Sequence, residues 1–305
     1  MSVYSDIIDL QADSLMFTED FADDNLLIIN KLIKQVLNIR YKDFADFKKQ
    51  VTKIYNNTFK EIKQLYITEL GTNAGNISDE LNQVIRAGNQ TGKRVKKLTT
   101  QKLESIVRQS VFEGEVVYGG NPLTERLRLF MELSRKKVLG SVKQGINQGL
   151  SAQQIARKIR PIVGDSKNAA DRIARTTANA VGNDTLLNTY KANDELIKGV
   201  MHSTTLDSRT CTRCASGSDK VYRLGKQPYT LPLHPRCRCV WVPIMYGDKP
   251  IEMTYAKWFE GTSDKRKLKI LGPTRYELYK QGKVKINDFA TDLKIKRLDQ
   301  LPKPD

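Results

Sequence analysis

The chain has 305 residues, 28% of them charged, and a formal net charge of +17 at pH 7. No apolar run is long enough to cross a bilayer, and the first thirty residues lack the basic and apolar regions of a signal peptide. We therefore expect a protein made in a reducing cytosol, without a membrane anchor and long enough for two or three domains.

The charge is distributed unevenly along the chain. Residues 1–30 contain no Lys or Arg and seven acidic residues, namely Asp6, Asp9, Asp13, Glu19, Asp20, Asp23 and Asp24. Since this stretch carries −7, residues 31–305 carry +24. A region with this much positive charge favours a polyanionic partner, such as double-stranded DNA bound without sequence preference. The simpler alternative is a solvated basic surface.

Residues 1–24 are the first predicted region, an acidic N-terminal tail. They offer few apolar anchors, so we expect them not to pack a core. Such a tail can dock on a basic patch of a partner, cover the protein's own basic surface until DNA displaces it, or remain a solvated end.

Residues 25–150 are the second region and are predicted to be helical. One helix is expected over residues 25–38, and another runs from an N-cap at Asp43 to a stop at Gly71, along a continuous apolar stripe. Further helices are expected to begin near Ser78, Thr100 and Thr124. Glycines interrupt the pattern at Gly114, Gly119 and Gly120.

Two basic segments are candidate contacts for nucleic-acid phosphates. The first lies in residues 89–97, which lack the spacing of a P-loop, and its cations are Lys93, Arg94, Lys96 and Lys97. The cations of the second are Lys265, Arg266, Lys267 and Lys269.

The remaining regions are 151–195, 196–246 and 247–305. In the first, Ser151 caps a short helix that Pro161 ends, and a second helix covers residues 167–191. The second is rich in Thr, Val, Tyr, Pro and Gly, which indicates short strands and hairpins around a metal. The third is a basic tail with one or two helical turns near Tyr255. The predicted fold class is mainly α, with a small α+β metal-binding module and an irregular C-terminal tail.

All four cysteines lie between residues 207 and 243, in the sequences Cys211-Thr-Arg-Cys214 and His234-Pro-Arg-Cys237-Arg-Cys239. Thiolates gathered this closely indicate one structural zinc ion with four protein ligands. Cys-x-Cys leaves one residue in which to turn two ligands towards one ion, so His234 can replace a cysteine. His202 and Asp207 are weaker candidates.

Other chemistries of the cysteines fit less well. Disulfides require oxidation after the protein has left the cytosol. A redox Cys-x-x-Cys belongs at a strand-to-helix junction of a βαβ unit, which is absent. The signatures of a nucleobase deaminase and of a zinc metalloprotease are absent as well.

Three blocks of the sequence resemble the Mu F-like phage head morphogenesis family, whose members are also called minor head or minor capsid proteins. The blocks are Arg172-Ile-Ala-Arg175-Thr176 with Tyr190; Asp207-Ser-Arg209-Thr210 with the cysteine segment and Pro243; and Trp258, Ile270-Leu271-Gly272, Arg275, Leu278 and Gly282. The resemblance covers about residues 150–290. The chain departs from the family at Thr177, where Glu is frequent, and Cys211 belongs to a cysteine pair that varies.

The resemblance implies a virion component rather than an enzyme. Such proteins associate with the portal and with capsid or scaffold proteins, enter the procapsid at few copies, and take part in packaging or ejection of DNA. It places the protein inside the head near the portal, and in the host cytoplasm during assembly. Two alternatives are a zinc-dependent hydrolase or nuclease acting on nucleic acid and a host-type zinc-ribbon protein. A catalytic zinc would need an open coordination position and a nearby base.

Overall fold

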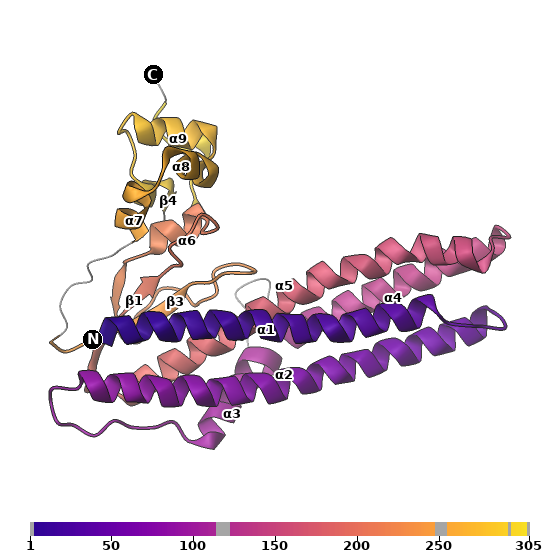
Figure 1. Cartoon of the computed structure of the whole chain (residues 1–305), viewed down its shortest axis with the longest axis horizontal. Coiled ribbons are helices and arrows are strands. Elements are labelled where there is room, and N and C mark those ends of the chain that lie inside the picture. The colour runs from indigo at the N-terminus through magenta and orange to yellow at the C-terminus, as the bar shows by residue number, and fades with distance from the viewer. Residues whose placement is uncertain (1–2, 114–122, 248–254, 292–293, 304–305) are drawn as a thin grey trace.

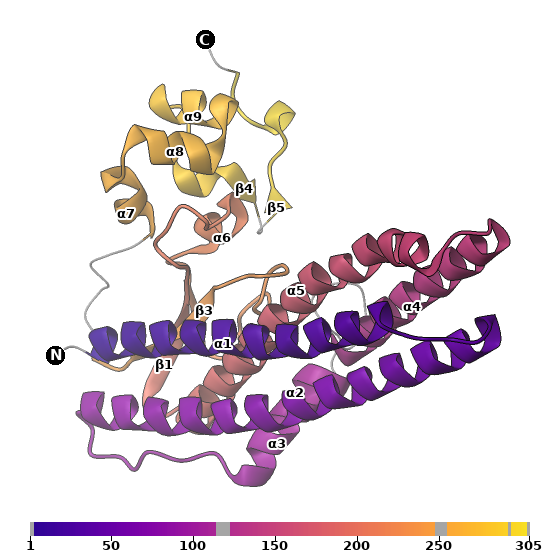
Figure 2. The same ribbon diagram turned by 45° about the vertical axis from the view of Figure 1, so that its right-hand side comes forward.

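The structure, a computed structural model, describes residues 3–113, 123–247, 255–291 and 294–303 (Figure 1). Four long helices form an elongated bundle, and a small sheet and the C-terminal helices lie towards one end of it (Figures 1 and 2). The predicted fold class is confirmed: the chain is mainly α, with a small sheet near a cysteine and histidine cluster. None of the described helices has the length and apolar character that a membrane span requires.

The bundle consists of two helical hairpins. Helices α1 (Val3–Leu37) and α2 (Phe44–Gly88) form one, and α4 (Leu123–Asn147) and α5 (Ala152–Ala192) form the other. The turns of both hairpins lie at the same end, far from the sheet (Figures 1 and 2). Helix α3 (Thr100–Arg108) continues into a π-helical turn (Gln109–Glu113) and packs on α2.

The expected acidic tail is wrong, because α1 runs through residues 3–37 without a break at residue 24. Phe21 is 1% exposed and packs against Tyr66 of α2, with ring centroids 4.9 Å apart. The acidic side chains of Asp13, Glu19, Asp20, Asp23 and Asp24 are exposed. Residues 3–24 therefore belong to an amphipathic helix whose apolar face joins the core and whose acidic face meets solvent.

The expected stops at Gly71 and Pro161 are also wrong. Helix α2 continues through Gly71, so it has no stop there and no new helix begins at Ser78. The buried stripe continues past the glycine through Leu70, Ala74 and Leu81. A helical Gly destabilises by about 1 kcal/mol relative to Ala, and burying one Leu side chain offsets more than that.

Pro161 lies inside α5, which is one helix rather than the two predicted. An interior proline costs about 3 kcal/mol because it removes a hydrogen bond and clashes with the preceding turn. Ile155, Ile159 and Val163 are buried on either side of it. Their burial against the other helices outweighs the local preference.

Several of the predicted helix starts are confirmed, although those at residues 25, 78 and 167 lie inside longer helices. The carboxylate of Asp43 accepts a hydrogen bond from the Asp46 N–H at 2.8 Å and caps α2. Ser151 caps α5 in a capping box with Gln154. Thr99, one residue before the expected start, caps α3. The glycine breaks predicted at 114, 119 and 120 lie outside the described residues.

The sheet contains β1 (Ile197–Ser203), β2 (Val221–Arg223) and β3 (Val240–Met245), all antiparallel in the order β2-β1-β3. A short helix, α6 (Thr212–Gly217), lies between β1 and β2 in the chain. Gly199 allows β2 to approach β1, since a Cβ at this position would lie 2.5 Å from the Tyr222 carbonyl oxygen.

The expected irregular C-terminal tail is wrong. Residues 255–301 form α7 (Tyr255–Gly261), α8 (Asp264–Leu271), α9 (Pro273–Lys280), two 3₁₀ turns (Ile286–Phe289 and Leu298–Gln300) and a two-stranded ribbon, β4 (Ala290–Thr291) with β5 (Lys294–Ile295). Their apolar side chains, such as Phe259 and Phe289, form a hydrophobic cluster that also contains Ala215 of α6. The C-terminal unit is therefore packed on the helix that carries the first cysteine pair.

Candidate metal centre

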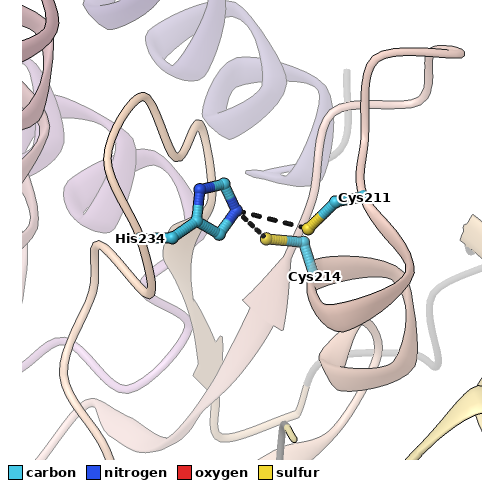
Figure 3. Close-up of side chains that lie close together, drawn as sticks. All are labelled: Cys211, Cys214 and His234. Carbon is cyan, nitrogen blue, oxygen red and sulfur yellow. Dashed lines mark hydrogen bonds between the residues drawn. The ribbon is translucent and has the colours of Figure 1, made fainter. Parts of the chain in front are cut away.

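The five predicted ligands converge on one spot beside the sheet. The Nε2 atom of His234 lies 3.3 Å from Sγ of Cys211 and 3.0 Å from Sγ of Cys214 (Figure 3). The Sγ atom of Cys214 also lies 3.8 Å from the Sγ atom of Cys237. The donor atoms form two groups, Cys211–Cys214–His234 and Cys214–Cys237–Cys239, and within each group all donors lie within 4.8 Å of one another. Cys214 belongs to both.

The spacing of Cys214 and Cys237 fits a tetrahedral metal ion. Two thiolates bound at about 2.3 Å with a tetrahedral angle are about 3.8 Å apart, the separation of Cys214 and Cys237. All four cysteines are free, so no disulfide competes for them in this structure. Sulfur and imidazole donors can therefore hold a metal here, with five candidates for four positions.

The orientation of His234 suits a ligand. Its Nδ1 lies 2.8 Å from the carbonyl oxygen of Pro235, which can only accept, so Nδ1 carries the proton. The neutral imidazole therefore presents the Nε2 lone pair to the cysteines (Figure 3). Without a metal, the hydrogen bond to Cys211 raises the pKa of His234 to about 9. A metal ion would replace that proton.

The pKa values of the four thiols are alternately lowered and raised along the chain. A hydrogen bond from Cys214, with a further contribution from His234, lowers the pKa of Cys211 to about 4. Hydrogen bonding to Cys214 likewise lowers the pKa of Cys237. The pKa of Cys214 is raised because its thiol donates to Cys211, and burial raises the pKa of Cys239. Four thiols this close together cannot all lose their protons without repelling one another. A bound cation would remove that repulsion.

A tight turn presents the second cysteine pair. The Cys237 N–H donates to the His234 carbonyl at 3.0 Å, with Pro235 and Arg236 at the two central positions. Arg236 has φ +60°, which is the left-handed conformation that the third residue of a type II turn requires. The His-Pro-x-Cys spacing therefore turns His234 and Cys237 towards the same point.

The Asp207 carboxylate joins the two cysteine loops instead of binding metal. Its two oxygens accept hydrogen bonds from both terminal nitrogens of Arg238, at 2.6 and 2.7 Å. Burial acts to raise the pKa of Asp207, but the hydrogen bonds from Arg238 and Arg209 outweigh it and lower the pKa to about 2. This bidentate pair ties the loop before Cys211 to the loop between Cys237 and Cys239. His202, the other weak candidate, donates to or accepts from the Tyr229 hydroxyl at 2.9 Å.

Helix α5 holds β3 through buried asparagines that the sequence analysis missed. The side chains of Asn179 and Asn183 donate to the Cys239 carbonyl at 3.2 and 3.1 Å, and Asn183 accepts from the Trp241 N–H at 3.0 Å. The Tyr190 hydroxyl donates to the Trp241 carbonyl at 2.9 Å. The signal was present, since these residues recur at four- and seven-residue steps along one helical face.

The Arg-Ile-Ala-Arg-Thr block of α5 holds the turn. The hydroxyl of Thr176 accepts from the Arg236 N–H at 3.2 Å. The Asp171 carboxylate accepts from Arg236 at 2.5 Å and from Arg175 at 2.8 Å. Thr177, where the family often has Glu, is fully buried and donates to the Ile173 carbonyl at 2.8 Å. The first two blocks of family resemblance thus meet at the metal centre.

The eight predicted nucleic-acid contacts lie in two separate places. Lys93 and Lys96 lie 3.5 and 3.8 Å from Glu195, and Lys97 lies 2.7 Å from Asp79. Lys267 lies 3.9 Å from Asp264 and over the ring of Tyr279. Arg94, Lys265, Arg266 and Lys269 are exposed. Most of these cations are part of the solvated surface, and several lie beside a carboxylate.

The fold and the site define a mainly helical protein with a cluster of cysteines and a histidine beside its small sheet. Residues 136–242 match the family model described as Phage Mu protein F like protein. This match supports the resemblance to the Mu F-like family that the sequence predicted, over about a third of the chain. The matched residues include α5, β1, β2, the first three residues of β3 and all five candidate ligands, whereas the third block of resemblance lies beyond them. No curated protein and no solved structure matches the chain.

Proposed function

We propose that the protein is a minor head protein of a phage, with a structural zinc ion in the Mu F-like domain. The observation that carries this proposal is the convergence of the family's motifs on one cluster of five sulfur and imidazole donors. The proposed role in head morphogenesis rests on the family match, and the proposed zinc ion rests on the set of donor atoms.

Zinc is the metal that this donor set favours. Thiolate and imidazole donors in tetrahedral arrangement select zinc over magnesium or calcium, which require oxygen ligands. A structural role fits better than catalysis, because the donors suffice to fill all four positions. The nearby Asp207 is engaged by Arg238 and is not placed as a general base. These contacts favour the minor head protein over a zinc-dependent hydrolase or nuclease.

The proposed partners are the portal, capsid or scaffold proteins and double-stranded DNA. In this proposal the protein enters the procapsid at few copies, stays inside the head near the portal, and contributes to packaging or ejection of DNA. The positive charge supports an environment of packaged DNA, since a polyanion attracts a basic protein through counterion release.

Head assembly tests this proposal. Heads purified from a phage that encodes the chain should contain it at few copies, and portal should co-purify with it from procapsids. A phage that lacks the gene should form heads that fail in packaging or delivery. Normal infectious particles without the chain would refute the proposal. Zinc-dependent cleavage of DNA by the purified protein would instead support the nuclease.

A further inference from the structure

We propose that the end of the helical bundle far from the sheet binds the phosphate backbone of duplex DNA. We call residues 26–55 and 134–169 the distal arm. Its inner limit is marked by two buried hydrogen bonds, from Asn25 to the Ala170 carbonyl at 3.2 Å and between Tyr55 and Ser134 at 2.9 Å. The arm contains both hairpin turns (Figures 1 and 2). This inference rests on the proposed DNA binding and gives it a location.

The distal arm concentrates the positive charge of the molecule. Its 66 residues contain fifteen Lys and Arg against three acidic residues, so it carries +12. The other 239 residues together carry +5. The cations are Lys31, Lys34, Arg40, Lys42, Lys48, Lys49, Lys53, Arg135, Lys136, Lys137, Lys143, Arg157, Lys158, Arg160 and Lys167. A cluster of this size on one part of a protein is the electrostatic footprint of a polyanion site.

Most cations of the arm have no carboxylate beside them, in contrast to Lys93, Lys96 and Lys97. All are exposed except the half-buried Arg135, which donates to Thr52 at 3.2 Å. Within the described part of the chain, Lys31 alone among them has a carboxylate within 4.0 Å, that of Glu61. Two of the arm's three acids, Asp43 and Asp46, are occupied by hydrogen bonds at the start of α2.

The rest of the arm's surface favours nucleic acid over protein or membrane. Protein interfaces have an apolar centre, whereas DNA interfaces are more polar and far more positive. Among the described large apolar side chains of the arm, only Leu27 and Ile146 are exposed, and they lie on different hairpins. The apolar faces of the helices meet inside the bundle, so no face is left to lie in a membrane.

The arm is also long enough for several phosphates. The part of α5 within it, residues 152–169, extends about 27 Å at about 1.5 Å per residue. Duplex DNA carries one charge per about 1.7 Å of axis with both strands counted, so this length spans about sixteen phosphates, and one face of the duplex presents part of them. Cations on all four helices can thus contact the backbone without reading the bases.

A matched pair of charge variants tests the location. The arm variant combines Lys136→Gln, Lys137→Gln, Lys143→Gln and Arg157→Gln, all exposed positions. The control combines Lys93→Gln, Arg94→Gln, Lys96→Gln and Lys97→Gln, so both lose three lysines and one arginine. Binding to a mixed-sequence duplex is measured by fluorescence anisotropy across a salt series, with unfolding curves as a check of folding.

We expect the slope of log K against log salt to become shallower by up to about 3.6 in the arm variant, since each lost phosphate contact removes about 0.9. The control should keep the native slope within about 0.9. If the native protein binds and the arm variant binds equally well, or both variants weaken alike, the arm is not the site. If the native protein does not bind duplex at any salt, DNA binding itself fails.

A second variant and a second probe keep the test decisive. If the first arm variant does not fold, Lys34→Gln, Arg40→Gln, Lys48→Gln and Lys49→Gln remove the same charges from the other hairpin, and the same loss is expected. Poly-glutamate is the probe for an acidic protein surface. An arm variant that loses poly-glutamate binding but keeps duplex binding would assign the arm to a protein partner and overturn the inference.

Discussion

The helical bundle and the metal centre are stabilised in different ways. The bundle buries a long series of large apolar side chains, among them Ile29, Ile62 and Leu70, which are all 0% exposed. The sheet has three short strands, and the cluster beside it combines apolar side chains such as Trp241 with three buried cysteines and with polar contacts from α5. We therefore expect the bundle to be stable through its apolar core, and we propose that the module of residues 196–246 depends on a bound metal.

The largest expected effect comes from removing the donor that both ligand groups share. Cys214→Ser leaves neither group with three donors, so we expect loss of the metal and unfolding of residues 196–246 with the bundle still formed. Structural zinc sites contribute on the order of 10 kcal/mol to folding. Hydrogen exchange should show lost protection in β1 and β3 and retained protection in α2.

Cys211→Ser is the matched control. It leaves Cys214, His234, Cys237 and Cys239, so we expect one metal per chain and a protected sheet. His234→Ala should likewise keep the metal through four thiolates, and the double variant should lose it. Loss of metal in only one of the single variants would identify that residue as the fourth ligand.

A cavity in the bundle should produce the converse result. Ile62→Ala removes a fully buried side chain of α2 and should destabilise the bundle by about 2–5 kcal/mol. Denaturant unfolding measures the loss, and metal content should stay unchanged. A loss of metal in the folded variant would show that the two regions do not act separately.

Asn183→Ala tests how α5 supports the sheet. It leaves the Trp241 N–H without its partner in a buried position, at a cost of about 1–3 kcal/mol. We expect faster metal release to a chelator and a smaller change in bundle unfolding. Asn188→Ala is the control on the same helix, because Asn188 is half-buried and donates to Asp184 within α5. Equal effects of the two variants would contradict a special role for Asn183.

The smallest effects compare two Gly→Ala substitutions. At Gly71 in α2 a Cβ meets nothing within 4 Å, so the variant should stabilise the bundle by about 0.5–1 kcal/mol. At Gly199 the Cβ meets the Tyr222 carbonyl, so the same substitution should loosen β2 and speed metal release. Thermal unfolding measures the first and chelator kinetics the second. Stabilisation at both sites would contradict the close strand approach.

The sequence predicted local features and failed where distant packing decides. Asp43 and Ser151 were identified as caps because capping involves residues only three positions apart. Gly71 and Pro161 were misread as stops because what keeps those helices continuous is burial against other helices. The acidic tail was misread because Phe21 meets a partner, Tyr66, that lies far away in sequence.

The five donor residues of the candidate metal centre were predictable from the sequence. The contacts that hold those residues in place were not. Close spacing identified the five donors, since Cys-x-x-Cys and His-Pro-x-Cys place ligands on single turns. The bidentate contact between Asp207 and Arg238 spans two loops, and Asn183 reaches β3 from another element. Sequence spacing does not show such contacts, so Asp207 was predicted only as a weak ligand candidate and Asn183 was missed.

Metal content of the native protein tests the central claim most directly. Protein purified under reducing conditions without added metal should contain one zinc ion per chain by elemental analysis. Its removal by a chelator should abolish hydrogen-exchange protection in β1 and β3 while α2 keeps its protection. Protein without stoichiometric metal whose sheet is nevertheless protected would contradict the account.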